Sequence, residues 1–321
     1  MITLTVIALG IIIGLAAALQ KGTRSTECLY HHRKGLLPIS LIIICYGTFN
    51  FGANVFPLDQ LFHLMQKQGA IRAFVDLERN IDKNGTQFSI SGTAALPHTL
   101  PGTVILVLGE SANRDEMSAF TSMDCDTTPW ERSKSKDSQF YFFPHSYANF
   151  PNTIMALTQA LTSVNQYNHE PISHAVDIMT LAKKAGYTTY WFSTQSQNSV
   201  SDSAITVIAK QADHAIWTRG YDEGLLSLLE SVPASQNNFI ILHLMGSHFR
   251  YDKRVSPSFA HEQGWTPLSK NHKKEWYRRS LFYTDTLLKK IYEYGTSYLN
   301  LQSMIYCSDH GEKESLSKFC P

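Results

Sequence analysis

The stretch TVILVLGES (residues 103–111) decides how the larger part of this sequence folds. Its first six residues are all apolar or β-branched, which is typical of a strand that is buried on both faces of a sheet. Similar strands are predicted at residues 187–192, 239–244 and 303–307. The helices predicted between them cover residues 174–185, 222–232 and 272–294, the last ending at Gly295. Strands that alternate with helices indicate an α/β sandwich with a mostly parallel sheet.

The composition is that of a folded protein with little net charge. The 321 residues include 28 Lys and Arg against 27 Asp and Glu, and 17% of the residues are charged while 43% are hydrophobic. These values exclude a disordered polyelectrolyte and argue against a nucleic-acid partner, which would favour a strongly basic chain.

Two uncharged runs near the N-terminus, residues 2–19 and 36–56, are each about long enough to cross the ~30 Å hydrocarbon core of a bilayer. The loop between them, residues 20–35, carries four Lys and Arg against a single Glu, which is the bias of a cytoplasmic loop. We therefore expect two transmembrane helices within residues 1–56 and everything after them outside the cytoplasm. A cleaved signal peptide is the alternative for the first run, and a buried or re-entrant helix is the alternative for the second.

Residues 57–102 are predicted to connect this membrane part to a domain formed by residues 103–321. Apolar residues first recur at helical spacing, which predicts an amphipathic juxtamembrane helix that packs either on the domain or on the lipid surface. Asn-Gly, Ser-Gly and Pro-Gly dipeptides then indicate a linker. Of the five cysteines, Cys125, Cys307 and Cys320 lie in the exported domain, where at most one disulfide can form among them.

Polar residues follow the predicted strands, at the sheet edge where open α/β folds bind ligands. Glu110 follows the first strand, and Asp309 and His310 follow the last. Together they offer oxygen and imidazole donors, a mixed set that suits zinc or manganese. A turn or helix cap is the alternative for the Asp-His pair, and a surface carboxylate is the alternative for Glu110.

Thr153 is the candidate nucleophile, because it precedes a helix predicted at residues 154–161. The N-terminus of a helix favours a phosphate, and metal coordination can ionise a hydroxyl at neutral pH. The alternative is that Thr153 only caps the helix.

Taken together, these segments resemble the phosphoethanolamine transferases of the sulfatase/alkaline-phosphatase superfamily, bacterial inner-membrane enzymes that decorate lipopolysaccharide. The similar segments occur in family order: VILVLGES (104–111), Arg114-Asp115 with Ser118, TTP (127–129), Asn152-Thr153, FSTQ (192–195), YDE (221–223), LHLMGSH (242–248), YTD (283–285) and SDHGE (308–312). The resemblance implies that Glu110, Thr153, Asp309 and His310 hold a Zn²⁺ ion. It further implies that His248 approaches the transferred phosphoryl group or a second metal.

The function implied by the resemblance is a membrane-anchored transfer of phosphoethanolamine from phosphatidylethanolamine to lipopolysaccharide, at lipid A or the core, through an intermediate on Thr153. The catalytic domain would face the periplasm. Family members usually have about five spans and a further His-Gly segment after SDHGE, so this sequence, which ends at Pro321, is expected to be shortened at both ends. The alternatives are a sulfatase-like hydrolase or phosphoglycerol transferase with the same site, and an inactive membrane remnant.

Overall fold

The computed structural model describes residues 101–168, 175–196 and 203–312. Five strands form one sheet in the order β3-β2-β4-β1-β5, and every pairing between them is parallel. The strands are β1 (Thr103–Gly109), β2 (Thr188–Ser193), β3 (His214–Trp217), β4 (Asn238–His243) and β5 (Leu301–Ser308). The predictions of an α/β class and a mostly parallel sheet are confirmed.

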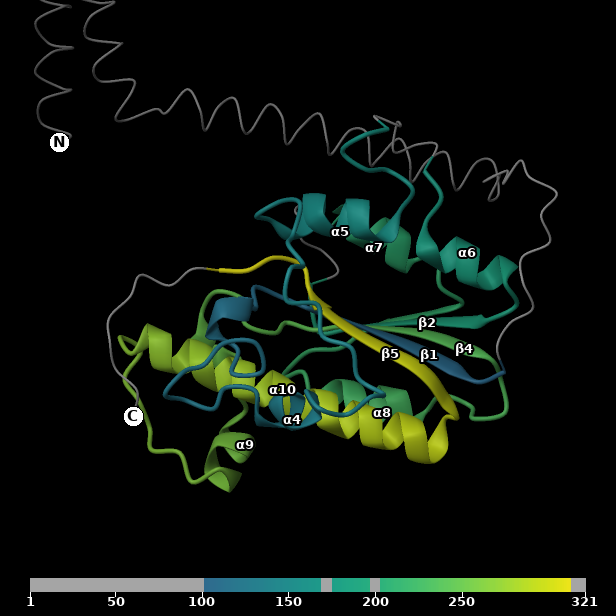
Figure 1. The fold of residues 1–321 in the computed structure, drawn as a ribbon. Helices are drawn as coiled ribbons and strands as arrows, with labels where there is room; N and C mark the ends of the chain where they lie inside the picture. The colour runs from purple at the N-terminus through teal and green to yellow at the C-terminus, as the bar shows by residue number, and fades with distance from the viewer. Residues whose placement is uncertain (1–100, 169–174, 197–202, 313–321) are drawn as a thin grey trace, which may run out of the picture. The chain divides into compact units, whose positions relative to one another are not determined.

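Helices cover both faces of this sheet (Figure 1). One face is covered by α5 (Thr153–Leu161), α6 (Ile178–Lys184) and α7 (Ser203–Ala209). The other face is covered by α8 (Gly224–Glu230) and α10 (Lys273–Tyr298). The short helix α4 (Pro129–Lys134) packs against α10, and α9 (Pro257–Glu262) lies beside α10. Two short 3-10 helices, η1 (Arg114–Glu116) and η3 (Tyr251–Lys253), belong to the connections.

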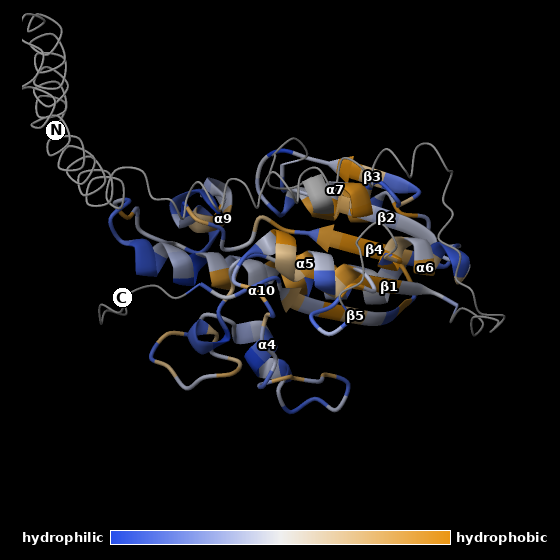
Figure 2. Ribbon diagram, turned by 90° about the horizontal axis from the view of Figure 1, so that it is seen from above, coloured by the Kyte–Doolittle hydropathy of each residue, from blue (hydrophilic) through white to orange (hydrophobic). Residues whose placement is uncertain are grey.

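The sheet has a hydrophobic core on each face, because successive residues of a strand point to opposite sides. Ile241 of β4 joins the core beneath α5, α6 and α7, which contains Trp191, whereas Ile240 and Leu242 join the core shared with α8 and α10. All six residues of β4 are buried, and the strand stands out as hydrophobic in Figure 2. The continuous apolar run read from the sequence thus reflects burial on both faces.

The four predicted strands are present, with ends that agree to within two residues. The prediction that the long helix ends at Gly295 is wrong, because α10 continues to Tyr298. Gly295 lies in a crowded helix contact: a Cβ built there would lie 3.3 Å from Leu301 Cδ2 and 3.4 Å from Ile105 Cδ1. This glycine therefore allows the helix to approach β1 and β5 and does not end it.

The predicted membrane spans, the loop at residues 20–35 and nearly all of the predicted juxtamembrane segment lie outside the described residues. Among the residues that are described, no helix combines the length and the apolar character needed to cross a bilayer. Cys125 is disulfide-bonded, whereas Cys307 is a free, exposed thiol on β5.

Candidate metal centre

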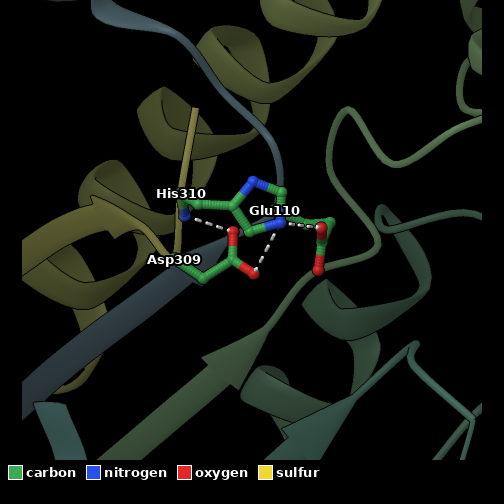
Figure 3. Close-up of side chains that lie close together, drawn as sticks. All are labelled: Glu110, Asp309 and His310. Atoms are coloured by element: carbon green, nitrogen blue, oxygen red, sulfur yellow. Dashed lines mark hydrogen bonds and ion pairs between the residues drawn. The ribbon is translucent and has the colours of Figure 1, made fainter. Parts of the chain in front are cut away.

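Three polar side chains meet at the carboxyl ends of β1 and β5, which are neighbours in the sheet. Gly109 and Ser308 are paired in register, so the residues that follow them, Glu110 and Asp309, leave the sheet side by side. His310 completes the group, and Figure 3 shows its ring between the two carboxylates. One potential ligand atom from each of the three residues lies within 4.8 Å of the other two.

The turn at Ser111 holds this group in place. Ser111 has a φ of 58°, a left-handed backbone that is uncommon for a residue other than glycine. Its backbone N–H donates to Asp309 Oδ1 at 3.0 Å, and its hydroxyl donates to Glu110 Oε1 at 2.8 Å. The Tyr277 hydroxyl donates to the Ser111 carbonyl at 2.8 Å, which ties the turn to α10. The two buried carboxylates are thus fixed relative to each other by one residue.

Thr153 is the first residue of α5, and its hydroxyl donates to Glu110 Oε2 at 3.1 Å. The helix cap is the preceding residue, because Asn152 Oδ1 accepts the Met155 N–H at 3.1 Å. The alternative that Thr153 serves only as the cap is therefore wrong, and its hydroxyl faces the carboxylate group instead.

Hydrogen bonds, burial and neighbouring charges shift the pKa of all three residues of the group. His310 Nε2 lies 3.3 Å from Glu110 Oε1, and the hydrogen bond to Glu110 raises the pKa of His310 to about 9. Burial raises the pKa of Glu110, but hydrogen bonds from His310 and Ser111 outweigh it and bring this pKa below its usual value. Burial and the negative charge of Glu110 raise the pKa of Asp309. Two carboxylates facing one imidazolium leave a net negative charge, which favours a cation.

The environment of one buried oxygen in this group favours a bound cation. Asp309 Oδ2 is buried and has no hydrogen-bond partner among the described residues, and His310 Nε2 lies 3.6 Å from it. A buried carboxylate oxygen without a partner is costly unless something electropositive contacts it. The donor set of two carboxylates, one imidazole and one hydroxyl is also a set that Zn²⁺ accepts.

Two further residues lie at the edge of the group. His248, which the family resemblance implies for the site, is exposed on the turn after β4. Its electrostatic interaction lowers the pKa of Glu110, but it does not join the three-residue cluster. Gln195 is the last residue of the FSTQ segment and follows β2. Its side-chain amide donates to the Leu244 carbonyl at 2.9 Å and lies 3.4 Å from Glu110 Oε2. Its position after β2, at the same sheet edge, was the signal for this contact.

Comparison with known proteins places this geometry in a family. A family model described as Sulfatase matches residues 102–316. The Escherichia coli K12 protein named "Putative transferase YhbX" is 30% identical over 219 residues, which are 67% of this chain and 39% of the relative. "Phosphoethanolamine transferase OpgE" of the same strain is 30% identical over 221 residues, which are 65% of this chain and 39% of the relative. The chain thus spans well under half the length of these curated relatives.

Among solved structures, the C-terminal periplasmic domain of EcEptC from Escherichia coli superposes with a TM-score of 0.58 at 26% identity, covering 68% of each chain. A second structure of that domain, described as a complex with Zn, gives a TM-score of 0.56. Because the Sulfatase model covers well over half of the residues, including Glu110, Thr153, Asp309 and His310, the chain belongs to the sulfatase family, and its relatives there include proteins named phosphoethanolamine transferases.

Proposed function

We propose that this chain acts as a membrane-anchored, metal-dependent transferase that moves phosphoethanolamine from phosphatidylethanolamine to lipopolysaccharide, at lipid A or the core, in the periplasm. The position of the Thr153 hydroxyl is the main support for this proposal, because it lies at the N-terminus of α5 and donates to a carboxylate of the cation-binding group. The name of OpgE supports the transferred group, the periplasmic EcEptC domain supports the compartment, and the Zn complex of that domain supports the metal.

Glu110, Thr153, Asp309 and His310 would hold the cation, which we propose to be Zn²⁺, with Mn²⁺ as the alternative that the same donors accept. A cation bound there would lower the pKa of the Thr153 hydroxyl and neutralise negative charge on the phosphoryl oxygens. The hydrogen bond from Thr153 to Glu110 already holds the hydroxyl beside this position.

In the first half-reaction, Thr153 Oγ attacks the phosphorus of phosphatidylethanolamine. The bond from Oγ to phosphorus forms, the bond from phosphorus to the diacylglycerol oxygen breaks, and the Thr153 hydroxyl proton ends, in net, on diacylglycerol. The phosphoryl group then lies at the N-terminus of α5, where the first N–H groups and the helix dipole favour an anion. His248, exposed nearby, would contact its oxygens.

In the second half-reaction, a hydroxyl or phosphate of the acceptor attacks the phosphothreonine. The bond from phosphorus to Oγ breaks, and Thr153 regains the proton that the acceptor loses. A covalent intermediate on Thr153 lets the two lipid substrates use one site in turn.

The proposal predicts a covalent adduct that mass spectrometry can detect. The full chain, solubilised in detergent and loaded with Zn²⁺, is incubated with phosphatidylethanolamine, and the tryptic peptide containing Thr153 is analysed. We expect a phosphoethanolamine adduct on this peptide, because Thr153 is the attacking group. Thr153→Ser keeps the hydroxyl and should still give an adduct, whereas Thr153→Ala should give none.

The donor is tested in parallel with phosphatidylglycerol. A phosphoglycerol adduct in place of phosphoethanolamine would keep the site and the nucleophile but reassign the donor. If a folded, zinc-loaded wild-type chain forms neither adduct, the proposed transfer by this chain is wrong.

A further inference from the structure

Asp222 lies just before α8, outside the cation-binding group, and is buried with 2% of its surface exposed. Both oxygens of its carboxylate bind the turn that follows β4, and one of them also binds Thr194, which follows β2. Oδ1 accepts the Met245 N–H at 2.8 Å and the Thr194 hydroxyl, and Oδ2 accepts the Gly246 N–H at 2.9 Å. Two consecutive peptide groups of the turn are therefore oriented by one carboxylate.

The turn held by Asp222 packs directly against the backbone of Glu110. The Ser247 N–H donates to the Glu110 carbonyl at 2.9 Å. Gly246 has a φ of +50°, and a Cβ there would lie 2.8 Å from Glu110 N and 3.0 Å from Glu110 O. A contact this close requires glycine, so the position of Gly246 limits where the Glu110 backbone can lie.

The same turn also supports the side chain of Glu110. Gln195 donates to the Leu244 carbonyl at 2.9 Å, and from there its amide reaches Glu110 Oε2 at 3.4 Å. Movement of the turn would therefore displace Glu110 both at its backbone and at the oxygen that accepts the Thr153 hydroxyl.

We infer that Asp222 is a positioning residue for the cation site: by fixing the turn at residues 244–247, it places Glu110 so that its carboxylate can bind the cation together with Asp309 and His310. This inference rests on the proposed function, since it assumes that these residues bind a metal. It adds a residue that never contacts the metal but sets the site's affinity for it.

The charged form of Asp222 suits this role. Both of its oxygens accept hydrogen bonds, as those of a carboxylate do. Burial raises its pKa above the usual value, and these hydrogen bonds and the positive charge of Arg254 oppose that rise. A carboxylate accepts at both oxygens, whereas an asparagine amide would turn a donor toward one of these N–H groups. Asp222→Asn should therefore release one end of the turn while changing the side-chain volume very little.

The test is zinc affinity, measured by competition with a chromogenic chelator on the purified full chain in detergent. We expect Asp222→Asn to weaken zinc binding about 10- to 100-fold, the usual effect of removing a group that orients a metal ligand. The visible absorption spectrum of the Co²⁺-loaded variant should also change, because it reports ligand geometry and not overall stability.

Asp177→Asn is the matched control. Asp177 is also a buried aspartate, with 4% of its surface exposed, and it accepts the Thr180 N–H at 3.0 Å and the Thr180 hydroxyl at 2.7 Å. It pairs with Thr162, at the end of α5 opposite Thr153. Its zinc affinity and Co²⁺ spectrum should match those of the wild type.

Unchanged zinc affinity and an unchanged Co²⁺ spectrum in a folded Asp222→Asn variant would overturn the inference. So would an equal loss in Asp177→Asn. If Asp222→Asn does not fold, Thr194→Val is the second test, because it removes one donor to Asp222 and keeps the carboxylate. We expect Thr194→Val to lose zinc affinity severalfold. An unchanged zinc affinity in this variant would contradict the inference. A wild-type chain that binds no zinc would instead refute the proposed metal site itself.

Discussion

Glu131 is an acidic residue whose environment opposes its charge. It lies in the first turn of α4, and its Oε2 is buried without a hydrogen-bond partner among the described residues. Burial, together with the nearby charge of Asp285, raises the pKa of Glu131 to about 8. The folded chain therefore holds a proton on Glu131 at neutral pH that the unfolded chain releases.

The release of this proton should appear in the pH dependence of the free energy of unfolding. A carboxyl group whose pKa is higher in the folded state stabilises the fold at acidic pH, and this stability is lost as the pH rises from about 4.5 to about 8. Glu131→Gln removes the titration, so the free energy of unfolding of the wild type should fall relative to this variant by roughly 1 kcal/mol per pH unit. Urea unfolding at pH 5, 6, 7 and 8 measures the difference.

Glu262→Gln, at an exposed position of α9, serves as the control and should follow the wild type across this range. Parallel curves for wild type and Glu131→Gln would show that Glu131 is ionised in the folded chain, contrary to expectation.

Individual residues of the site were predictable from the sequence where a strand end fixed their place. Glu110 and Asp309 follow neighbouring parallel strands, so the topology alone brings them together. The contacts of Gln195 and Asp222 were not predictable, because they depend on the path of the turn after β4. A sequence pattern shows that this turn exists but not which side chains reach it.

At the scale of elements, Asp285 of α10 caps a different helix. Its two carboxylate oxygens accept the Trp130 and Glu131 N–H groups of α4 at 2.8 and 2.9 Å. Thr128, the residue in the cap position of α4, makes no side-chain cap hydrogen bond. The first turn of α4 therefore depends on α10 for its hydrogen bonds.

Asp285→Asn should lower the free energy of unfolding by about 1–3 kcal/mol, because an amide can accept only one of the two N–H groups and leaves the other facing a donor. Urea unfolding at constant pH measures this loss. Asp124→Asn, in an exposed position of the loop before α4, should change stability by less than about 0.5 kcal/mol. Equal small effects in both variants would mean that α4 does not need the cap.

The length and the burial of each element determine whether the sequence predicted it. β4 is completely buried and reads as one apolar run, whereas β3 is a four-residue strand at the sheet edge with alternating exposure and gives no such run. The helices α4 and α9 have only six residues, too few to establish a periodic pattern. Their positions are fixed by tertiary contacts, such as the Asp285 cap, that no local pattern contains.

For the whole molecule, the proposed cation site joins parts of the chain that are far apart in sequence. Its donors come from the end of β1, the start of α5 and the segment after β5. A ligand that binds the folded state alone stabilises it, by about 2.7 kcal/mol at a free concentration 100-fold above its dissociation constant. Bound zinc should thus raise the unfolding temperature by roughly 5–10 °C for a domain of this size.

Differential scanning fluorimetry of the full chain, with added Zn²⁺ or with a chelator, tests this stabilisation. The shift should disappear in Glu110→Gln, which removes one charged donor and keeps the shape of the side chain. A shift of the same size in this variant would place the stabilising zinc elsewhere in the molecule.

The position of β1 in the sheet also dictates when the domain can form. β1 lies between β4 and β5, and both neighbours come much later in the sequence: Thr103 pairs with Asn238, and Gly109 pairs with Ser308. During synthesis, β1 therefore leaves the ribosome as an apolar strand with neither partner yet made. Contacts of such long sequence separation slow folding and prolong the time in which strand edges can aggregate. The sheet cannot be completed before residue 308 has been synthesised, so β1 must wait for both of its partner strands.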